Sequence, residues 1–174
     1  MAGLKSVIED LLAKIEADTS ITFARVWNNQ FAQTEDGSIY SFPFPCCFVE
    51  IINPDHNQLG LGFTQSDLGI RFHIGQTYYN DPNNGTIEQN LTIFDLRDEL
   101  VSAFTYYEPV FCSGLMKVHE EQDFEHTNMY HYILDFKCSF VDTVGDTTTT
   151  QVIKPAPTDL TVNAEFDVTY MHKK

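Results

Sequence analysis

Apolar residues recur at helical spacing near the start of the chain and again after its middle. The spacing i, i+3, i+4, i+7 places them on one face of an amphipathic helix. Residues 4–15 and 93–104 follow this rule, and Asp95 is the expected N-cap of the second helix. The apolar positions are Leu4, Val7, Ile8, Leu11, Leu12 and Ile15 in the first helix, and Leu96, Leu100, Ala103 and Phe104 in the second.

Alternation with a period of two predicts the strands. Residues 66–79 alternate as a half-buried strand does, with Arg71 and His73 opposite the apolar positions. Residues 129–142 predict another strand, preceded by one within residues 108–119. The apolar positions are Leu68, Ile70, Phe72 and Ile74 in one strand, and Tyr130, Tyr132, Leu134, Phe136, Cys138 and Phe140 in the other, against His131, Asp135, Lys137 and Ser139.

Residues 20–52 are rich in β-branched and aromatic residues, interrupted by Asp36-Gly37 and by Pro43 and Pro45. This composition predicts two or three strands, with the prolines at an edge or in a loop. Three polar stretches are expected to be loops: "NPDHNQLGLG" at 53–62, "NDPNNG" at 80–85 and "EEQDFEHTN" at 120–128.

The composition changes after Asp142. Residues 143–159 contain four consecutive threonines and two prolines, which is typical of an extended arm. Residues 160–170 alternate strictly and predict a strand that pairs either with its own sheet or with the open edge of a neighbouring subunit. We therefore divide the chain into a domain at residues 1–142 and a C-terminal arm and strand at residues 143–174.

The formal net charge of −15 is the strongest compositional feature. Among the ten basic residues only Lys173 and Lys174 are neighbours, so the sequence has no basic stripe to neutralise phosphates. We therefore expect no binding of nucleic acid. The acidic surface either repels DNA that passes close by or only keeps the protein in solution, and both interpretations stay open.

The sequence also indicates a compartment. No apolar run approaches the ~20 residues that a membrane-spanning helix needs, and charged residues interrupt the first helix, unlike a secretory signal. We expect a protein made in the cytoplasm, with buried free thiols that form no CxxC pair. The cysteines are Cys46, Cys47, Cys112 and Cys138.

The stretch "VHEEQDFEHTNMYHYILDFKCSF" at 118–140 gathers His119, Asp123, His126 and His131. A zinc-protease helix needs a second histidine four residues after the first, and Asp123 stands there instead. The polar tip of a hairpin is the favoured interpretation, and a small metal- or ligand-binding enzyme that uses the His119–His131 cluster is the alternative. The sequence has no phosphate loop, dinucleotide loop or nucleophile elbow, so we assign no catalytic, metal-ligating or cofactor-binding residue and expect no enzymatic activity.

Other residues have both a functional and a structural interpretation. Cys112 served by His119 would make a nucleophile, but a cysteine among apolar strand residues is more often part of a core. Trp27 is expected to be a core or interface anchor. An extracellular adhesion domain with sugar-stacking aromatics is the least favoured reading, because the chain lacks a signal peptide and paired cysteines. Its candidates are Tyr78, Tyr79, Tyr106 and Tyr107.

Three segments carry a resemblance to a known family. They are "LKSVIEDLLAKI" at 4–15, "GIRFHIGQTYYNDPNNGTIEQNLTIFDLRDELVSAF" at 69–104, and "MKVHEEQDFEHTNMYHYILDFKCSFVD" at 116–142. In element order and apolar pattern they resemble the tail-terminator and head–tail neck proteins of tailed bacteriophages. The resemblance implies an α+β fold with a curved antiparallel or mixed β-sheet flanked by two helices.

The same resemblance implies a function. Such proteins are structural components of the virion that form homo-oligomeric rings around the DNA channel, between portal-side and tail-side proteins, without enzymatic activity, cofactor or membrane. It supplies no catalytic positions, and it would place the segment at Val118 near a ring interface or the channel rim. The additional arm after Thr143 leaves open a tail terminator or a connector ring of a short-tailed phage, for example in the crAss-like group.

Overall fold

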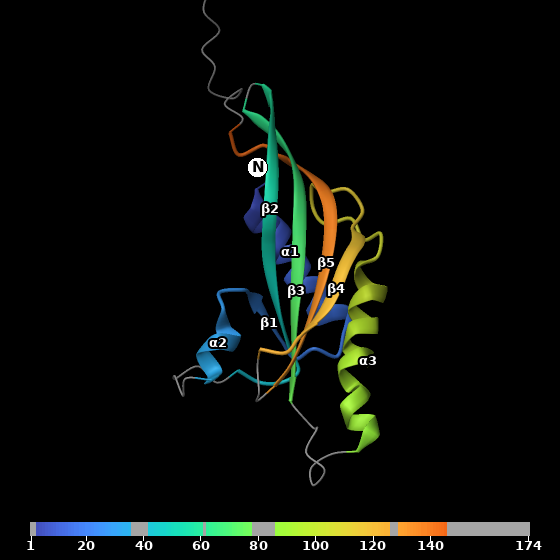
Figure 1. Ribbon diagram of the computed structural model, residues 1–174. Helices are drawn as coiled ribbons and strands as arrows, with labels where there is room; N and C mark the ends of the chain where they lie inside the picture. The colour runs from blue at the N-terminus through green and yellow to red at the C-terminus, as the bar shows by residue number, and fades with distance from the viewer. Residues whose placement is uncertain (1–2, 36–41, 61, 78–85, 126–128, 146–174) are drawn as a thin grey trace, which may run out of the picture.

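The computed structural model describes residues 3–35, 42–60, 62–77, 86–125 and 129–145, and it has an α+β fold (Figure 1). Within these residues a mixed sheet contains five strands in the order β1-β2-β3-β5-β4. β1 runs parallel to β2 and the other neighbours are antiparallel, so the predicted α+β class with a mixed sheet is confirmed. The strands are β1 (Phe23–Val26), β2 (Cys46–Gly60), β3 (Phe63–Thr77), β4 (Met116–Asp123) and β5 (Met129–Asp142).

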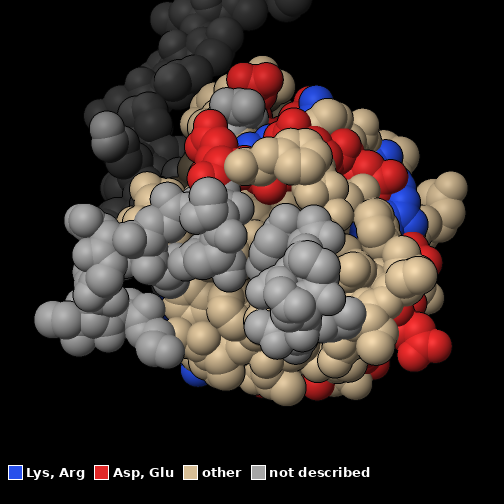
Figure 2. Space-filling model, turned by 60° about the horizontal axis from the view of Figure 1, so that its bottom comes forward, with Lys and Arg blue, Asp and Glu red and all other residues tan. Residues whose placement is uncertain are grey.

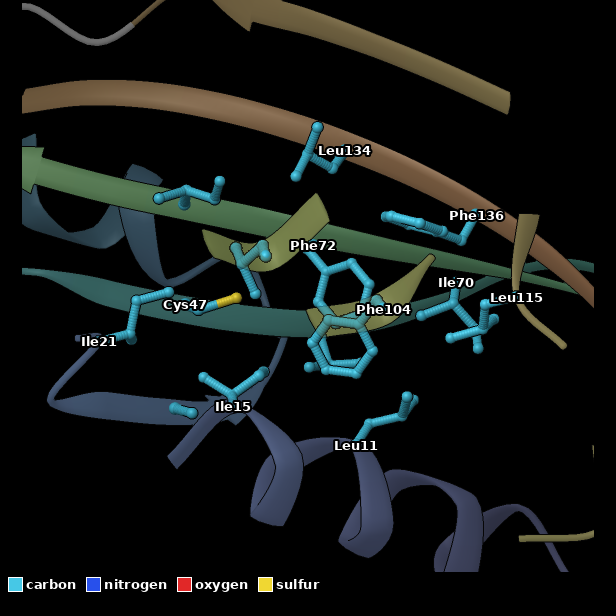
Figure 3. Packing of buried hydrophobic residues seen from close by; sticks show 14 of the residues in the cluster. Leu11, Ile15, Ile21, Cys47, Ile70, Phe72, Phe104, Leu115, Leu134 and Phe136 are labelled. Atoms are coloured by element: carbon cyan, nitrogen blue, oxygen red, sulfur yellow. The ribbon is translucent and has the colours of Figure 1, made fainter. Parts of the chain in front are cut away.

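The two predicted helices, α1 (Leu4–Asp18) and α3 (Ile87–Phe104), pack against one face of the sheet. Figure 3 shows Leu11 and Ile15 pointing from α1 toward the sheet residues Phe72 and Cys47. The apolar side chains of β3 and β5 complete this core, as their alternation predicts: Leu68, Ile70, Phe72, Ile74, Leu134, Phe136, Cys138 and Phe140 are all buried. We call this side of the sheet the helix-covered face and the opposite side the open face.

The start of α3 differs from the prediction. The helix begins at Ile87 rather than after Asp95, and Thr86 is its N-cap. Thr86 and Gln89 form a capping box, in which each side chain accepts the other's backbone N–H, at 3.3 and 2.9 Å. The first turns bury no apolar stripe, since Ile87 and Leu91 remain exposed, and the Thr86–Gln89 capping box is the sequence signal that marks this start.

The stretch 53–62 was wrongly predicted to be a loop. β2 continues to Gly60 and turns into β3 through two residues with positive φ, Gly60 (102°) and Gly62 (87°). Pro54 is tolerated because β1 pairs only with Cys46–Val49 and because the β2–β3 register shifts between Ile52 and Asp55. A polar hairpin of this kind has no apolar face to reveal its period.

One further element was missed, and one predicted strand has different bounds. The short helix α2 (Gln30–Glu35) follows β1, while Pro43 and Pro45 precede β2 as predicted for a loop. β4 extends through Asp123, so residues 120–123 are strand rather than loop, whereas residues 111–113 only bridge to β5 through Cys112 and Phe140. The polar residues of β4 have polar partners: Glu120 pairs with Arg97 of α3 at 2.7 Å, and Tyr130 Oη donates to Gln122 at 2.7 Å.

Several predictions fall outside the described residues. They concern the turn at 80–85, His126, most of the arm after Thr143, and the strand at 160–170. The division at residue 142 therefore stays a prediction. Among the described helices, none combines the length and apolar character that crossing a membrane requires.

Candidate functional site

The open face carries a row of ionisable residues across four strands. The strand register aligns Glu50 of β2 with Arg71 of β3, Arg71 with Asp135 of β5, and Asp135 with His119 of β4. Residues directly opposite in neighbouring strands lie on the same face, so this row is a consequence of topology. Figure 2 shows Asp and Glu side chains gathered along one side of the molecule with Lys and Arg among them.

A bidentate ion pair occupies the middle of the row. Arg71 Nε and Nη2 donate to the two carboxylate oxygens of Asp135 at 2.7 and 2.9 Å. Asp135 is buried, and its hydrogen bonds are the main reason that the pKa of Arg71 is raised. A planar guanidinium matches a carboxylate in this geometry, so the pair fixes β3 against β5 on the open face.

A chain of hydrogen bonds runs beside this pair from β2 to β4. His73 Nε2 lies 3.0 Å from Glu50 Oε2, and His73 Nδ1 lies 3.1 Å from His131 Nε2. His131 Nδ1 then lies 2.9 Å from Asp123 Oδ2. Both imidazoles are buried, at 4% and 2% exposure, while the two carboxylates at the ends reach solvent.

The first imidazole is neutral. Burial and, to a smaller extent, the positive charge of Arg71 together lower the pKa of His73 from 6.5 to about 3, against the opposing effects of Asp135 and Asp123. A neutral imidazole has one N–H donor and one acceptor nitrogen. Because the carboxylate of Glu50 accepts, His73 donates from Nε2 and accepts at Nδ1.

These roles fix the remaining protons. His131 must donate from Nε2 to His73 Nδ1, which leaves His131 Nδ1 facing the Asp123 carboxylate. Two bare acceptors would repel each other at 2.9 Å, so a further proton lies between them. Three hydrogen bonds among these four side chains require three protons, one more than two neutral imidazoles supply.

An aromatic cluster closes the imidazoles from solvent. The Trp27 ring stacks on His73 with centroids 3.8 Å apart and an 8° angle between planes, and Phe31 of α2 meets His131 edge-on at 4.7 Å. Phe48 of β2 contacts both the Trp27 ring and the Phe31 ring. Trp27 is thus a core anchor, as predicted, and both imidazoles are buried beneath this cluster.

Farther along the open face lies a shallow groove with a volume of about 450 Å³. Asp55 and Asp67 are directly opposite each other in the β2–β3 register, and Lys137 lines the groove with them. Like charges at opposite positions weaken a sheet. The groove therefore places two carboxylates and one ammonium group on the open face, beside the apolar side chains of Ile52 and Met116.

The predicted His119–His131 cluster is only partly brought together. Asp123 contacts His131, but His119 lies beside Glu121 at 3.5 Å on the exposed part of β4. Within the residues that the structure describes, no group of three or more His, Cys, Asp or Glu side chains is arranged to hold a metal ion. Sequence reasoning missed the roles of Glu50 and His73. Their only signal in the sequence is that each is a polar residue between apolar neighbours in a strand.

The cysteines are free thiols, and Cys46, Cys47 and Cys138 are buried as predicted. Burial raises the pKa of Cys46 to about 12, so its thiol stays protonated. A hydrogen bond with Cys138 and burial raise the pKa of Cys112. These environments favour the core interpretation of Cys112 over the nucleophile interpretation.

Comparison with known proteins gives no assignment: no family model matches the chain, and no curated protein is detectably similar to it.

Proposed function

We propose that the chain is a structural virion protein that forms a homo-oligomeric ring at the head–tail junction of a tailed phage, as a tail terminator or connector ring. DNA passes through the ring without specific binding, and portal-side and tail-side proteins contact it. The proposal is supported by the sequence resemblance and by an element order that agrees with it, from α1 through the sheet and α3 to the β4–β5 pair.

The observation that carries the proposal is a sheet with open edges on both sides. In the described part of the chain, β4 pairs only with β5, and β2 has no outer neighbour beyond Val49. A ring is built from head-to-tail contacts that join two different surfaces of each subunit. Two dissimilar edges on one subunit meet this requirement.

The charge distribution agrees with a passage for DNA. A net charge of −15 disfavours capture of the duplex, and the open face displays carboxylates such as Asp55, Asp67 and Glu121. A lumen lined by such a surface would let DNA slide through.

The alternative, a small metal- or ligand-binding enzyme that uses the His119–His131 cluster, is less favoured. His119 and His131 make different contacts, and the imidazoles of the buried chain are covered by Trp27 and Phe31. We therefore propose a protein without catalytic activity.

Sedimentation velocity of the full chain tests the proposal, alone and mixed with the portal-side and tail-side proteins of the same phage. We expect closed oligomers whose mass is a multiple of 19.9 kDa. A chain that stays monomeric at every concentration and binds neither set of proteins would contradict the ring.

A further inference from the structure

Exposed apolar side chains concentrate along one edge of the sheet. Phe111 and Ser113 hydrogen-bond to Val141 and Ser139 of β5, at 3.3 and 2.8 Å, and β4 continues along the same side of β5. Large apolar side chains from this region point to solvent. They are Tyr106, Val110, Phe111, Met116 and Val118, with exposures of 77, 41, 55, 57 and 51%, and we call them the β4 rim.

Two rim aromatics are held in a strained conformation. Tyr106 and Phe111 both have a φ of 62°, in the left-handed region that bulky residues rarely adopt. Backbone hydrogen bonds keep the loop there, including Tyr106 N–H to the Leu115 carbonyl at 2.8 Å. Exposed aromatic rings held in this way are typical of an interaction surface.

The backbone of β4 is also available. Every second residue of an edge strand directs its N–H and C=O away from its neighbour, where an added strand can bind them. α3 lies beside β4 (Figure 1) and contacts it through the Arg97–Glu120 pair, while the β4 residues 116–119 remain exposed. The edge and the rim together fit an extended segment with apolar side chains at alternate positions.

The sequence of this chain contains such a segment at residues 160–170. Its apolar positions alternate strictly with polar ones, and they are Leu160, Val162, Ala164, Phe166, Val168 and Tyr170. Residues 146–159, when extended, reach about 45 Å, comparable with the roughly 40 Å width of a domain of this size. The segment can therefore reach an adjacent subunit.

We propose that residues 160–170 of one copy add a strand to the outer edge of β4 in a second copy, with their apolar side chains packed on the β4 rim. This inference rests on the proposed ring, and it names the contact that joins neighbouring subunits. The occupant is a second copy because each subunit of a ring must hold the next one.

Cross-linking between two populations of the full chain tests the contact. One population carries Val118→Cys and is labelled with ¹⁵N, and the other is unlabelled and carries Phe166→Cys. After mild oxidation we expect a disulfide between residues 118 and 166 in a peptide of mixed isotopic composition, identified by mass spectrometry. In the control, Val26→Cys replaces Val118→Cys, because Val26 is equally exposed at 51% but lies on β1; we expect the mixed peptide to be lost.

The possible failures are distinguishable. Closed oligomers without the 118–166 link would overturn the strand contact and leave the ring intact. A chain carrying both Val118→Cys and Phe166→Cys that links within a monomer would show docking on its own sheet and overturn the second-copy contact. A monomeric chain with neither link would overturn both proposals.

Discussion

The two faces of the sheet are stabilised in different ways. The helix-covered face buries apolar side chains of β3 and β5 against α1 and α3, around Phe72. The open face holds an ion pair and a hydrogen-bonded chain of four side chains under an aromatic cover. Apolar burial is non-directional, whereas each polar contact depends on distance and on the position of a proton.

The two faces therefore differ in which amino-acid substitutions they tolerate. A core residue on the helix-covered face can be replaced by another apolar residue of similar volume at small cost. On the open face, removing one partner leaves a buried polar group without compensation, even if the shape is kept. The following substitutions test this contrast.

Phe72→Ala should have the largest effect. Phe72 is fully buried, with its ring 4.7 Å from Phe104 and 5.6 Å from Phe136. The cavity should lower the free energy of unfolding by about 3–5 kcal/mol, measured by urea denaturation. In the control Phe124→Ala, an exposed ring is removed, and the change should stay within about 0.5 kcal/mol. Equal losses would contradict the position of the core.

Asp135→Asn should break the open face while keeping its shape. The Arg71 guanidinium would lose its charged partner, and we expect a loss of about 2 kcal/mol, less than for a fully buried pair because Arg71 is partly exposed. Asp98→Asn is the matched control, since Asp98 also meets an arginine at 2.7 Å but is itself exposed. Its loss should be below about 1 kcal/mol. A larger loss in the control would show that burial is not the deciding factor.

His73→Gln should reveal the pH dependence that the buried hydrogen-bonded chain gives to the open face. The folded-state pKa of His73 is about 3 and the unfolded value is 6.5, so the unfolded chain binds a proton there that the folded chain does not. The stabilisation from His73 is therefore complete above pH 6.5 and is lost as the pH falls toward 3. Relative to the variant, the wild-type chain should lose about 1 kcal/mol per pH unit in this range.

The comparison for this experiment is His119→Gln, on the exposed part of β4. Denaturation curves of this variant should follow the wild-type curves at every pH. If the curves of the His73→Gln variant also followed the wild-type curves at every pH, the conclusion that His73 is buried and neutral would be contradicted.

The sequence predicts the two faces unequally. The period of two in β3 and β5 and the period of 3.6 in α1 identify the helix-covered face residue by residue, because apolar burial repeats with the backbone. The first turns of α3 and the polar half of β2 were missed because neither buries an apolar stripe. There the only signals were the Thr86–Gln89 capping box and the glycines at 60 and 62.

The buried chain was not predictable from local patterns. His73 and His131 are far apart in the sequence, and the β3–β5 register brings them together. Glu50 joins them through the β2–β3 register. The proximity of His119 to Asp123 in the sequence suggested a cluster, but His119 faces Glu121 and solvent instead. Sequence neighbours were a poor guide because pairing across strands decides which polar groups meet.

Electron cryomicroscopy of the virion to which we propose that this chain belongs tests the central claim most directly. The account predicts density for the α1–sheet–α3 fold repeated around the DNA channel at the head–tail junction, with β4 at the contact between subunits. Absence of this chain from the particle, or its presence as an isolated copy away from the channel, would contradict the account.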